Sequence, residues 1–305
     1  MTTTTPTPLP QQMGIDSTGR TWTDASALGD WLKCPRRWYI KHVLRRTPSG
    51  RTPALDFGTA WHQVMETHHQ GVVPVTPEQL ISIGRANGLT ETQDHRNQLM
   101  LEDAYAVFLK LDRIPYPPYL VDGKPIIEGA FALPLDDSTM YCGRIDRIVA
   151  LTNGKPAVED YKTSSANSAQ FWGEFEASVA QTGYLWAATQ ARGELVDTFI
   201  IQGLFTLKSG ITPKQLEERI FIRDYRVFDE WKAMVLSNTR RMAVLSRFGT
   251  TEVLTCGECC NRDACYSHKY GPCPFVAVCN MADPEARLPL LSGLGFTDYT
   301  WSPLA

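Results

Sequence analysis

Three neighbouring segments in the middle of the chain, all rich in apolar and β-branched residues, constrain the fold most strongly. They cover residues 124–135, 140–151 and 156–164, with the sequences KPIIEGAFALPL, MYCGRIDRIVAL and PAVEDYKTS. Asp-Asp-Ser at 136–138 and Asn-Gly-Lys at 153–155 are turn-forming sequences that typically join adjacent strands. The pattern therefore predicts three consecutive antiparallel strands.

Helical segments surround these strands. Apolar residues at helical spacing and their polar surroundings predict helices at 54–70, 77–111, 175–191 (closed by Gly193) and largely across 212–248, with a further strand at 196–207. The N-terminal segment 24–46 is also amphipathic, but Pro35 removes a backbone donor and divides it at Cys34. This order of elements predicts a mixed α/β fold whose sheet is flanked by helices.

The chain has 305 residues, of which 43% are hydrophobic and 21% are charged, which is typical of a soluble globular protein. No apolar run approaches the roughly 18 residues of a membrane helix. The first 14 residues, MTTTTPTPLPQQMG, lack the basic start and apolar centre of a secretory signal, so we expect a cytoplasmic protein. A net charge of −3 neither favours nor excludes nucleic acid as a partner.

The domain boundaries follow from these patterns. We expect residues 1–20 to form a disordered tail, because Thr and Pro dominate it. One domain should span residues 21–285, with N-terminal helices at 21–115, a core at 116–210 and a helical, cysteine-containing segment at 211–285. Residues 286–305 would be a C-terminal tail.

The strands carry a constellation of charged residues that could perform chemistry. Asp146 lies in GRIDRI, Asp160 follows fourteen residues later, and Lys162 comes two positions beyond. Strand alternation places Asp160 and Lys162 on one face. Two carboxylates from adjacent strands can hold Mg²⁺ or Mn²⁺, and a lysine beside them can position water and neutralise developing charge. The pair is weak by itself, because a strand ending in Asp-Tyr-Lys is also compatible with a solvated edge.

In combination, GRIDRI and VEDYKTS resemble the PD-(D/E)XK nuclease superfamily, in its RecB-like branch. This branch includes CRISPR-associated RecB-like exonucleases and many phage exonucleases. The resemblance extends from about Ser26 to Cys279, through the ordered segments SALGDWLKCPRRWY, FGTAWHQVME, QTGYLWAA and ACYSHKYGPCPFVAVC. It implies a restriction-endonuclease-like mixed sheet with an N-terminal helical part and a C-terminal iron–sulfur segment.

The resemblance also implies roles for individual residues. The metal ligands would be His62, Asp146, Asp160 and the carbonyl group of Tyr161. Lys162 would be the catalytic lysine, and Gln181 and Tyr184 would support the site and contact DNA. Glu128 matches an upstream acidic residue of some members. Without the resemblance, nothing distinguishes His62 from His68, His69 or His95.

Six of the eight cysteines lie between Cys256 and Cys279. The resemblance implies a [4Fe–4S] cluster held by Cys34, Cys265, Cys273 and Cys279, a structural cofactor that joins the two ends of the domain. Zinc is the alternative, because the spacing of Cys256 and Cys259 is that of a zinc finger, and Cys265 or His268 could complete the site. Buried, reduced cysteines without metal are a third interpretation.

The N-terminal segment presents a row of basic residues. Arg36, Arg37 and Lys41 could follow a phosphate backbone, although an ordinary solvated helix face has the same pattern. With the resemblance, these residues and Tyr184 are the expected DNA contacts.

The expected activity is therefore metal-dependent exonuclease cleavage of single-stranded DNA or duplex ends. Recombination or CRISPR-type proteins, or further copies of the chain, could be partners. A phage-encoded protein would act in the host cytoplasm. No phosphate-binding loop is present, so ATP is not expected. The alternatives are a non-catalytic DNA-binding or assembly protein with the nuclease fold, and a zinc-dependent regulator.

Overall fold

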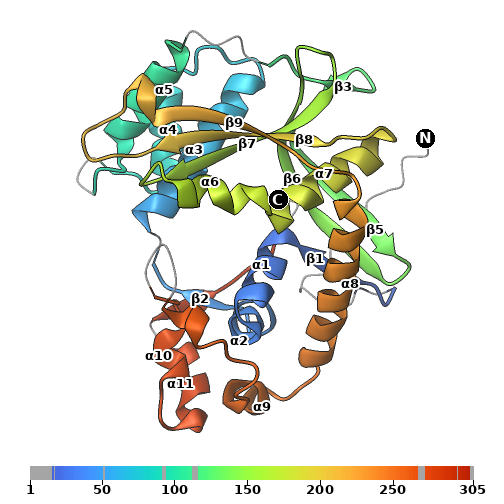
Figure 1. Ribbon diagram of the computed structural model, residues 1–305. Helices are drawn as coiled ribbons and strands as arrows, with labels where there is room; N and C mark the ends of the chain where they lie inside the picture. Colours follow the sequence, from blue (N-terminus) through green and yellow to red (C-terminus); the bar gives the residue numbers. More distant parts are fainter. Residues whose placement is uncertain are drawn as a thin grey trace. The chain divides into compact units, whose positions relative to one another are not determined.

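The computed structural model describes residues 16, 18–50, 52–90, 94–111, 116–266, 272–293 and 295–302 (Figure 1). Their contacts divide the chain into two compact units. Unit 1 contains the described residues of 1–50, 130–143 and 229–305, and unit 2 contains those of 51–129 and 144–228. His268, one of the residues expected to complete a zinc site, lies outside the described residues.

A mixed sheet forms the centre of unit 2. Its strands lie in the order β6 (Thr139–Ala150), β7 (Pro156–Ser164), β8 (Thr198–Phe205) and β9 (Leu216–Ile222). The β6–β7 and β8–β9 pairs are antiparallel, whereas β7 and β8 run parallel. Strand β5 (Ile127–Asp136) pairs with β6, and β3 (Leu120–Val121) pairs with β4 (Lys124–Pro125). The three predicted central strands and the mixed α/β class are confirmed.

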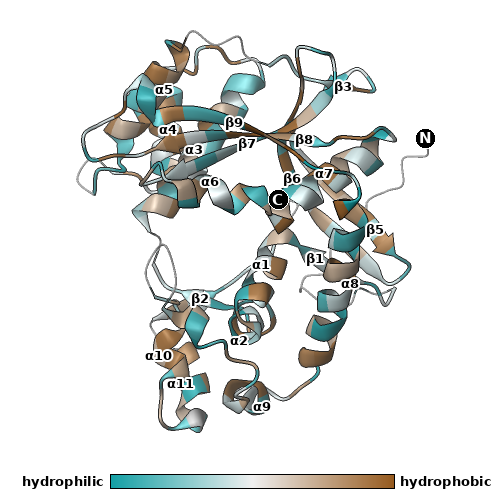
Figure 2. Cartoon of the chain, viewed as in Figure 1, coloured by the Kyte–Doolittle hydropathy of each residue, from teal (hydrophilic) through white to brown (hydrophobic). Residues whose placement is uncertain are grey.

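Helices cover both faces of this sheet. On one face, α3 (Pro53–His69) packs against β7, where a Cβ atom added at Gly58 would lie 3.1 Å from the Thr163 hydroxyl oxygen. Helices α4 (Pro77–Ala86) and α5 (Gln98–Leu109) pack with α3 around a core that includes Trp61 and Tyr161. On the other face, α7 (Val179–Arg192) contacts β7 and β8. Strand β8 is apolar along most of its length, as expected for a strand covered on both sides (Figure 2).

Three predicted elements of unit 2 differ from the structure. The helix expected at 77–111 is two helices, α4 and α5, and the Asn97 side chain caps the start of α5. The single helix expected at 175–191 is two helices, α6 (Ala169–Glu176) and α7, because the Ser178 side chain caps a new helix start. Gly193 ends α7 in a left-handed conformation, as predicted. The segment 212–248 is not all helical, since a short 3₁₀ turn (Pro213–Gln215) is followed by β9, which pairs with β8. Pairing with an open sheet edge overrides the charged, helix-like pattern there.

Unit 1 begins with β1 (Thr21–Asp24), which pairs in parallel with Thr139–Cys142 of β6. The Asp24 carboxylate caps α1 (Ala25–Lys33) by accepting a hydrogen bond from the Ala27 backbone N–H. Cys34 is extended, and α2 (Pro35–Trp38) starts at Pro35, which confirms the predicted break. Further elements are a π-helix (Tyr39–Val43), β2 (Arg46–Pro48) paired with β10 (Phe296–Asp298), α8 (Val227–Leu245), α9 (Thr250–Thr255), a 3₁₀ turn (Asp263–Cys265), α10 (Val276–Cys279), a 3₁₀ turn (Pro284–Ala286) and α11 (Arg287–Leu291).

None of the helices in the described part of the chain combines the length and apolar character needed to cross a membrane.

Candidate active site

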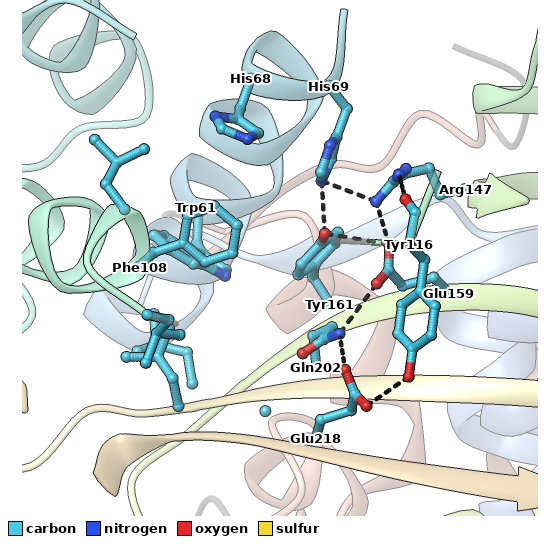
Figure 3. A pocket seen from close by; sticks show the side chains of 15 residues that line it. Trp61, His68, His69, Phe108, Tyr116, Arg147, Glu159, Tyr161, Gln202 and Glu218 are labelled. Carbon is cyan, nitrogen blue, oxygen red and sulfur yellow. Dashed lines mark hydrogen bonds and ion pairs between the residues drawn. The ribbon is translucent and has the colours of Figure 1, made fainter. Parts of the chain in front are cut away.

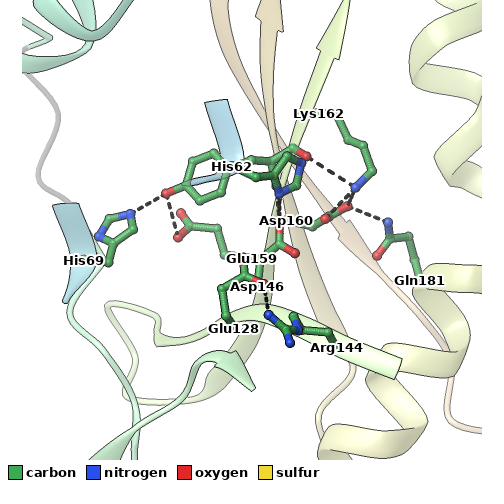
Figure 4. A network of polar contacts seen from close by, with 10 residues as sticks. His62, His69, Glu128, Arg144, Asp146, Glu159, Asp160, Lys162 and Gln181 are labelled. Atoms are coloured by element: carbon green, nitrogen blue, oxygen red, sulfur yellow. Dashed lines mark hydrogen bonds and ion pairs between the residues drawn. The ribbon is translucent and has the colours of Figure 1, made fainter. Parts of the chain in front are cut away.

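Asp146, Asp160 and Lys162 lie together where β6 and β7 run side by side (Figure 4). Arg147 is paired in register with Glu159, so the residues that adjoin them, Asp146 and Asp160, are cross-strand neighbours. The Lys162 ammonium lies 2.5 Å from the Asp160 carboxylate, and the Asp146 carboxylate accepts a hydrogen bond of 3.0 Å from the Tyr161 backbone N–H. The strand pairing that the sequence predicts therefore brings the three side chains into one site.

His62 reaches this site from α3. Its Nδ1 atom lies 3.1 Å from the Asp146 carboxylate. One ligand atom from each of His62, Glu128 and Asp146 lies within 4.8 Å of the others, the only such group of three or more metal-binding side chains among the described residues. Two carboxylates and an imidazole are a suitable donor set for Mg²⁺ or Mn²⁺.

Glu128 has an unusual backbone conformation for this role. Its φ angle is +47°, which is costly for a residue other than glycine and is typical of positions that packing and function hold in place. Arg144 lies beside it, with a nitrogen 3.7 Å from the Glu128 carboxylate. Sequence reasoning did not include Arg144, although it lies two residues before Asp146 and so shares its strand face.

The carboxylates of the two aspartates differ in acidity. Burial acts to raise the pKa of Asp146, but the adjacent His62 and Lys162 outweigh it and hold that pKa below its usual range. Burial raises the pKa of Asp160 to about 6, opposed by Lys162 and reinforced by the negative charge of Asp146. Two carboxylates this close repel each other when both are ionised. A cation at the site relieves that repulsion.

The other titratable groups respond to the same cluster. Burial and Asp146 raise the pKa of Glu128 to about 7. Burial acts to lower the pKa values of His62 and Lys162, but neighbouring carboxylates raise both above their usual values. Lys162 is therefore held as an ammonium cation, suited to neutralise negative charge rather than to act as a base.

Gln181 and Tyr184 belong to α7. Gln181 is buried, and its side-chain amide donates a hydrogen bond of 2.8 Å to the Asp160 carboxylate. Tyr184 follows one helical turn later and is partly exposed. The Tyr161 carbonyl oxygen accepts a hydrogen bond of 3.3 Å from the Lys162 ammonium. Gln181 is thus hydrogen-bonded to Asp160, and the Tyr161 carbonyl group is hydrogen-bonded to Lys162.

The four cysteines predicted to bind iron, Cys34, Cys265, Cys273 and Cys279, are all buried in unit 1. The Asn261 peptide connects two of them, because its N–H contacts the Cys34 sulfur at 3.4 Å and its carbonyl oxygen contacts the Cys265 sulfur at 3.5 Å. Burial, followed by the surrounding thiols, raises the pKa of Cys265 to about 11, and these thiols include all three other predicted ligands.

The spacing of the thiols bears on the zinc alternative. Sulfur atoms around a single tetrahedral zinc ion lie about 3.8 Å apart. Among the cysteines that the structure describes, no three sulfur atoms lie within 4.8 Å of one another.

The basic residues of the N-terminal helices have partners within unit 1. Arg36 is buried, and its guanidinium donates a hydrogen bond to the Cys256 carbonyl oxygen. Arg37 and Lys41 each form a 2.8 Å ion pair with the buried carboxylate of Asp30. The single negative charge of Asp30 therefore offsets part of their combined positive charge.

A mixed sheet that brings two adjacent carboxylates, a lysine and a histidine together holds the groups that metal-assisted hydrolysis of phosphate esters uses. The sequence profile of the PD-(D/E)XK nuclease superfamily matches residues 25–266. The chain therefore belongs to the PD-(D/E)XK nuclease superfamily. Members of this superfamily typically use Mg²⁺ or Mn²⁺.

Comparison with solved structures gives more distant matches. A candidate exonuclease from Eubacterium rectale is 14% identical, with a TM-score of 0.48, and the match covers 74% of this chain and 81% of that protein. SSO0001 is also 14% identical, with a TM-score of 0.32 and coverage of 73% and 76%. No curated protein sequence matches the chain.

Proposed function

We propose that this chain is a metal-dependent DNA exonuclease of the RecB-like branch, which hydrolyses phosphodiester bonds in single-stranded DNA or at duplex ends. One observation carries the proposal: Asp146, Asp160 and Lys162 meet on two neighbouring strands, with a further histidine and carboxylate within reach of a shared cation. The family match supports nuclease chemistry in general.

Each residue of the site has a definable task. His62, Glu128 and Asp146 would hold a Mg²⁺ or Mn²⁺ ion, and Asp160 adds a carboxylate from the neighbouring strand. The bound cation would supply acidification of water and neutralisation of phosphate charge. Lys162, kept protonated by the two aspartates, donates hydrogen bonds to the phosphate oxygens on which negative charge develops.

Gln181 acts as a positioning residue in this scheme. Its amide holds one oxygen of the Asp160 carboxylate, while the Lys162 ammonium holds the group from the other side. Tyr184, on the same helix, remains the proposed DNA contact, since an aromatic ring near a phosphate-binding site can stack on a base. Recombination or CRISPR-type proteins stay proposed partners.

The decisive experiment uses DNA labelled at the 5′ or the 3′ end, single-stranded and double-stranded, with Mg²⁺ or Mn²⁺. We expect progressive shortening from an end, reduced by at least about 10²-fold in Lys162→Ala, the loss that removing one charge-stabilising donor typically causes. Lys155→Ala is the matched control, because Lys155 is exposed in the turn before the same strand. Full activity in Lys162→Ala would contradict the mechanism, and DNA binding without cleavage in any metal would favour the non-catalytic alternative.

We further propose that Cys34, Cys265, Cys273 and Cys279 bind a structural [4Fe–4S] cluster. Their common burial supports a shared cofactor, and so does the influence of Cys34, Cys273 and Cys279 on the pKa of Cys265, because it requires the four thiols to lie near one another. Protein purified without oxygen should absorb at about 400 nm and contain about four irons per chain. The Cys265→Ser variant should lose both the absorbance and the iron. Stoichiometric zinc without iron would refute the cluster.

A further inference from the structure

Unit 2 contains a cavity of about 230 Å³ on the sheet face opposite the site carboxylates (Figure 3). The side chain of Tyr161 borders it, whereas its neighbours Asp160 and Lys162 point to the other face, because side chains alternate along β7. Nothing in the proposed nuclease chemistry uses this space. The cavity therefore needs its own explanation.

One wall of the cavity is polar. Arg147 is buried and forms a 2.5 Å ion pair with Glu159, which also accepts a hydrogen bond of 3.0 Å from the Gln202 amide. Gln202 in turn donates to Glu218 at 2.7 Å, and the Tyr116 hydroxyl donates to Glu218 at 2.8 Å. Such a chain of donors and acceptors along one wall can recognise a molecule by its hydrogen-bonding edge.

The opposite wall is aromatic and apolar. Trp61 and Phe108 stand edge to face, with ring centres 6.1 Å apart, and Leu204 and Leu216 extend the surface. Figure 3 shows these rings across the open space from the polar residues. An occupant that fits both walls is flat, aromatic on its face and polar at its edge.

The charges of the lining select against anions. Burial, followed by the charge of Arg147, lowers the pKa of His69 to about 3 and also lowers that of His68. Arg147 is paired with Glu159, and Glu218 is a second carboxylate in the lining, so the acidic side chains of the lining outnumber its one guanidinium. A phosphate group would be repelled there.

We propose that this cavity binds an uncharged nucleobase or nucleoside, separately from DNA cleavage on the other face. A base offers a flat π-surface for the aromatic wall and both donors and acceptors at its edge. Tyr161 lines the cavity with its ring while its backbone N–H holds the Asp146 carboxylate. An occupant would thus contact a residue that also organises the candidate active site.

The test measures binding without metal or DNA, so that its result does not depend on nuclease activity. Adenosine, guanosine, cytidine and thymidine, with their 5′-monophosphates and a trinucleotide, are offered to the full chain in equilibrium dialysis and saturation-transfer NMR. At least one nucleoside should bind with a Kd below about 1 mM, and its monophosphate and the trinucleotide should bind at least about tenfold more weakly. Preferred binding of the trinucleotide would instead assign the cavity to a base of the DNA substrate and overturn the proposal.

Variants of the polar wall decide whether the binding occurs in this cavity. Gln202→Leu removes the central amide and should weaken nucleoside binding about tenfold. Tyr116→Phe deletes a single hydroxyl group and should weaken it about threefold to tenfold, which keeps the test open if Gln202→Leu does not fold. Gln190→Leu, an exposed position on α7, is the matched control and should bind like the original protein. Absence of binding up to about 5 mM, or equal binding by all variants, would overturn the proposal.

Discussion

The ion pairs of Arg37 and Lys41 can be tested by changing the carboxylate that they share, Asp30. It is buried in unit 1 and accepts from Arg37 and Lys41 at 2.8 Å each, with the ring of His42 at 3.1 Å. Asp30→Asn preserves the shape of the side chain and removes its charge. The variant leaves two cations facing a neutral amide that cannot accept from both as strongly.

The expected loss of unfolding free energy follows from the burial of the partners. Removing one member of a buried ion pair typically costs about 3–5 kcal/mol. The Arg37 and Lys41 side chains keep 19% and 23% of their surface exposed, so water compensates part of the loss. We therefore expect about 3 kcal/mol, at the lower end of this range.

The effect should also depend on pH. Burial acts to raise the pKa of Asp30, but His42, Lys41 and Arg37 together hold it below its ordinary value of 3.8. A carboxyl group with a depressed pKa stabilises the folded state above its unfolded pKa, and this contribution is lost as the pH falls through the folded value. The stability difference between the original protein and Asp30→Asn should be present above about pH 5 and shrink below about pH 4.

Urea unfolding followed by tryptophan fluorescence measures the change, because Trp31 and Trp38 form an edge-to-face pair close to this cluster in the sequence. Asp136→Asn is the control, since its partner Arg240 is 68% exposed and such a surface pair contributes about 0–1 kcal/mol. Equal stability of Asp30→Asn and Asp136→Asn would refute the buried-cluster reasoning. A loss of DNA binding with unchanged stability would show that Arg37 and Lys41 serve DNA instead.

Three further changes have expected outcomes. Gln181→Leu removes the hydrogen bond to Asp160, so cleavage should slow by about 10–100-fold, while an unchanged rate would exclude a positioning role. Glu159→Gln leaves Arg147 buried without a counter-charge and should lower the unfolding free energy by about 3–5 kcal/mol in urea titrations; a loss under 1 kcal/mol would disprove this. Gly58→Val places a Cβ atom 3.1 Å from the Thr163 hydroxyl oxygen, with two methyl groups beyond it, and should cost about 1–3 kcal/mol, measured as a lower melting temperature in circular dichroism.

The parts of the fold that the sequence predicted correctly are those with a short-range signal. The period-2 alternation of β6 and β7 and the turn at 153–155 fix which residues face each other, so Asp146 and Asp160 were predicted neighbours. The same alternation places Glu159 on the other face, where it pairs with Arg147. Pro35 and Gly193 set helix boundaries through their own backbone chemistry.

Other features were decided by contacts between residues far apart in the chain. Strand β9 exists because it pairs with β8, although its own sequence is charged and helix-like. Arg37 and Lys41 form part of a basic pattern that is equally compatible with a DNA-binding surface, and only the position of Asp30 shows where their charge is compensated.

In the candidate active site, too, some features follow from local sequence and others from tertiary contacts. The sequence by itself determined that Asp146, Asp160 and Lys162 share one side of two paired strands, because strand geometry requires it. Only the tertiary structure brought His62 from α3 to the Asp146 carboxylate, placed Glu128 in a left-handed conformation beside both, and opened a cavity behind Tyr161. These arrangements depend on how a helix packs on a sheet, and helix–sheet packing is set by the summed shapes of many side chains rather than by any local pattern.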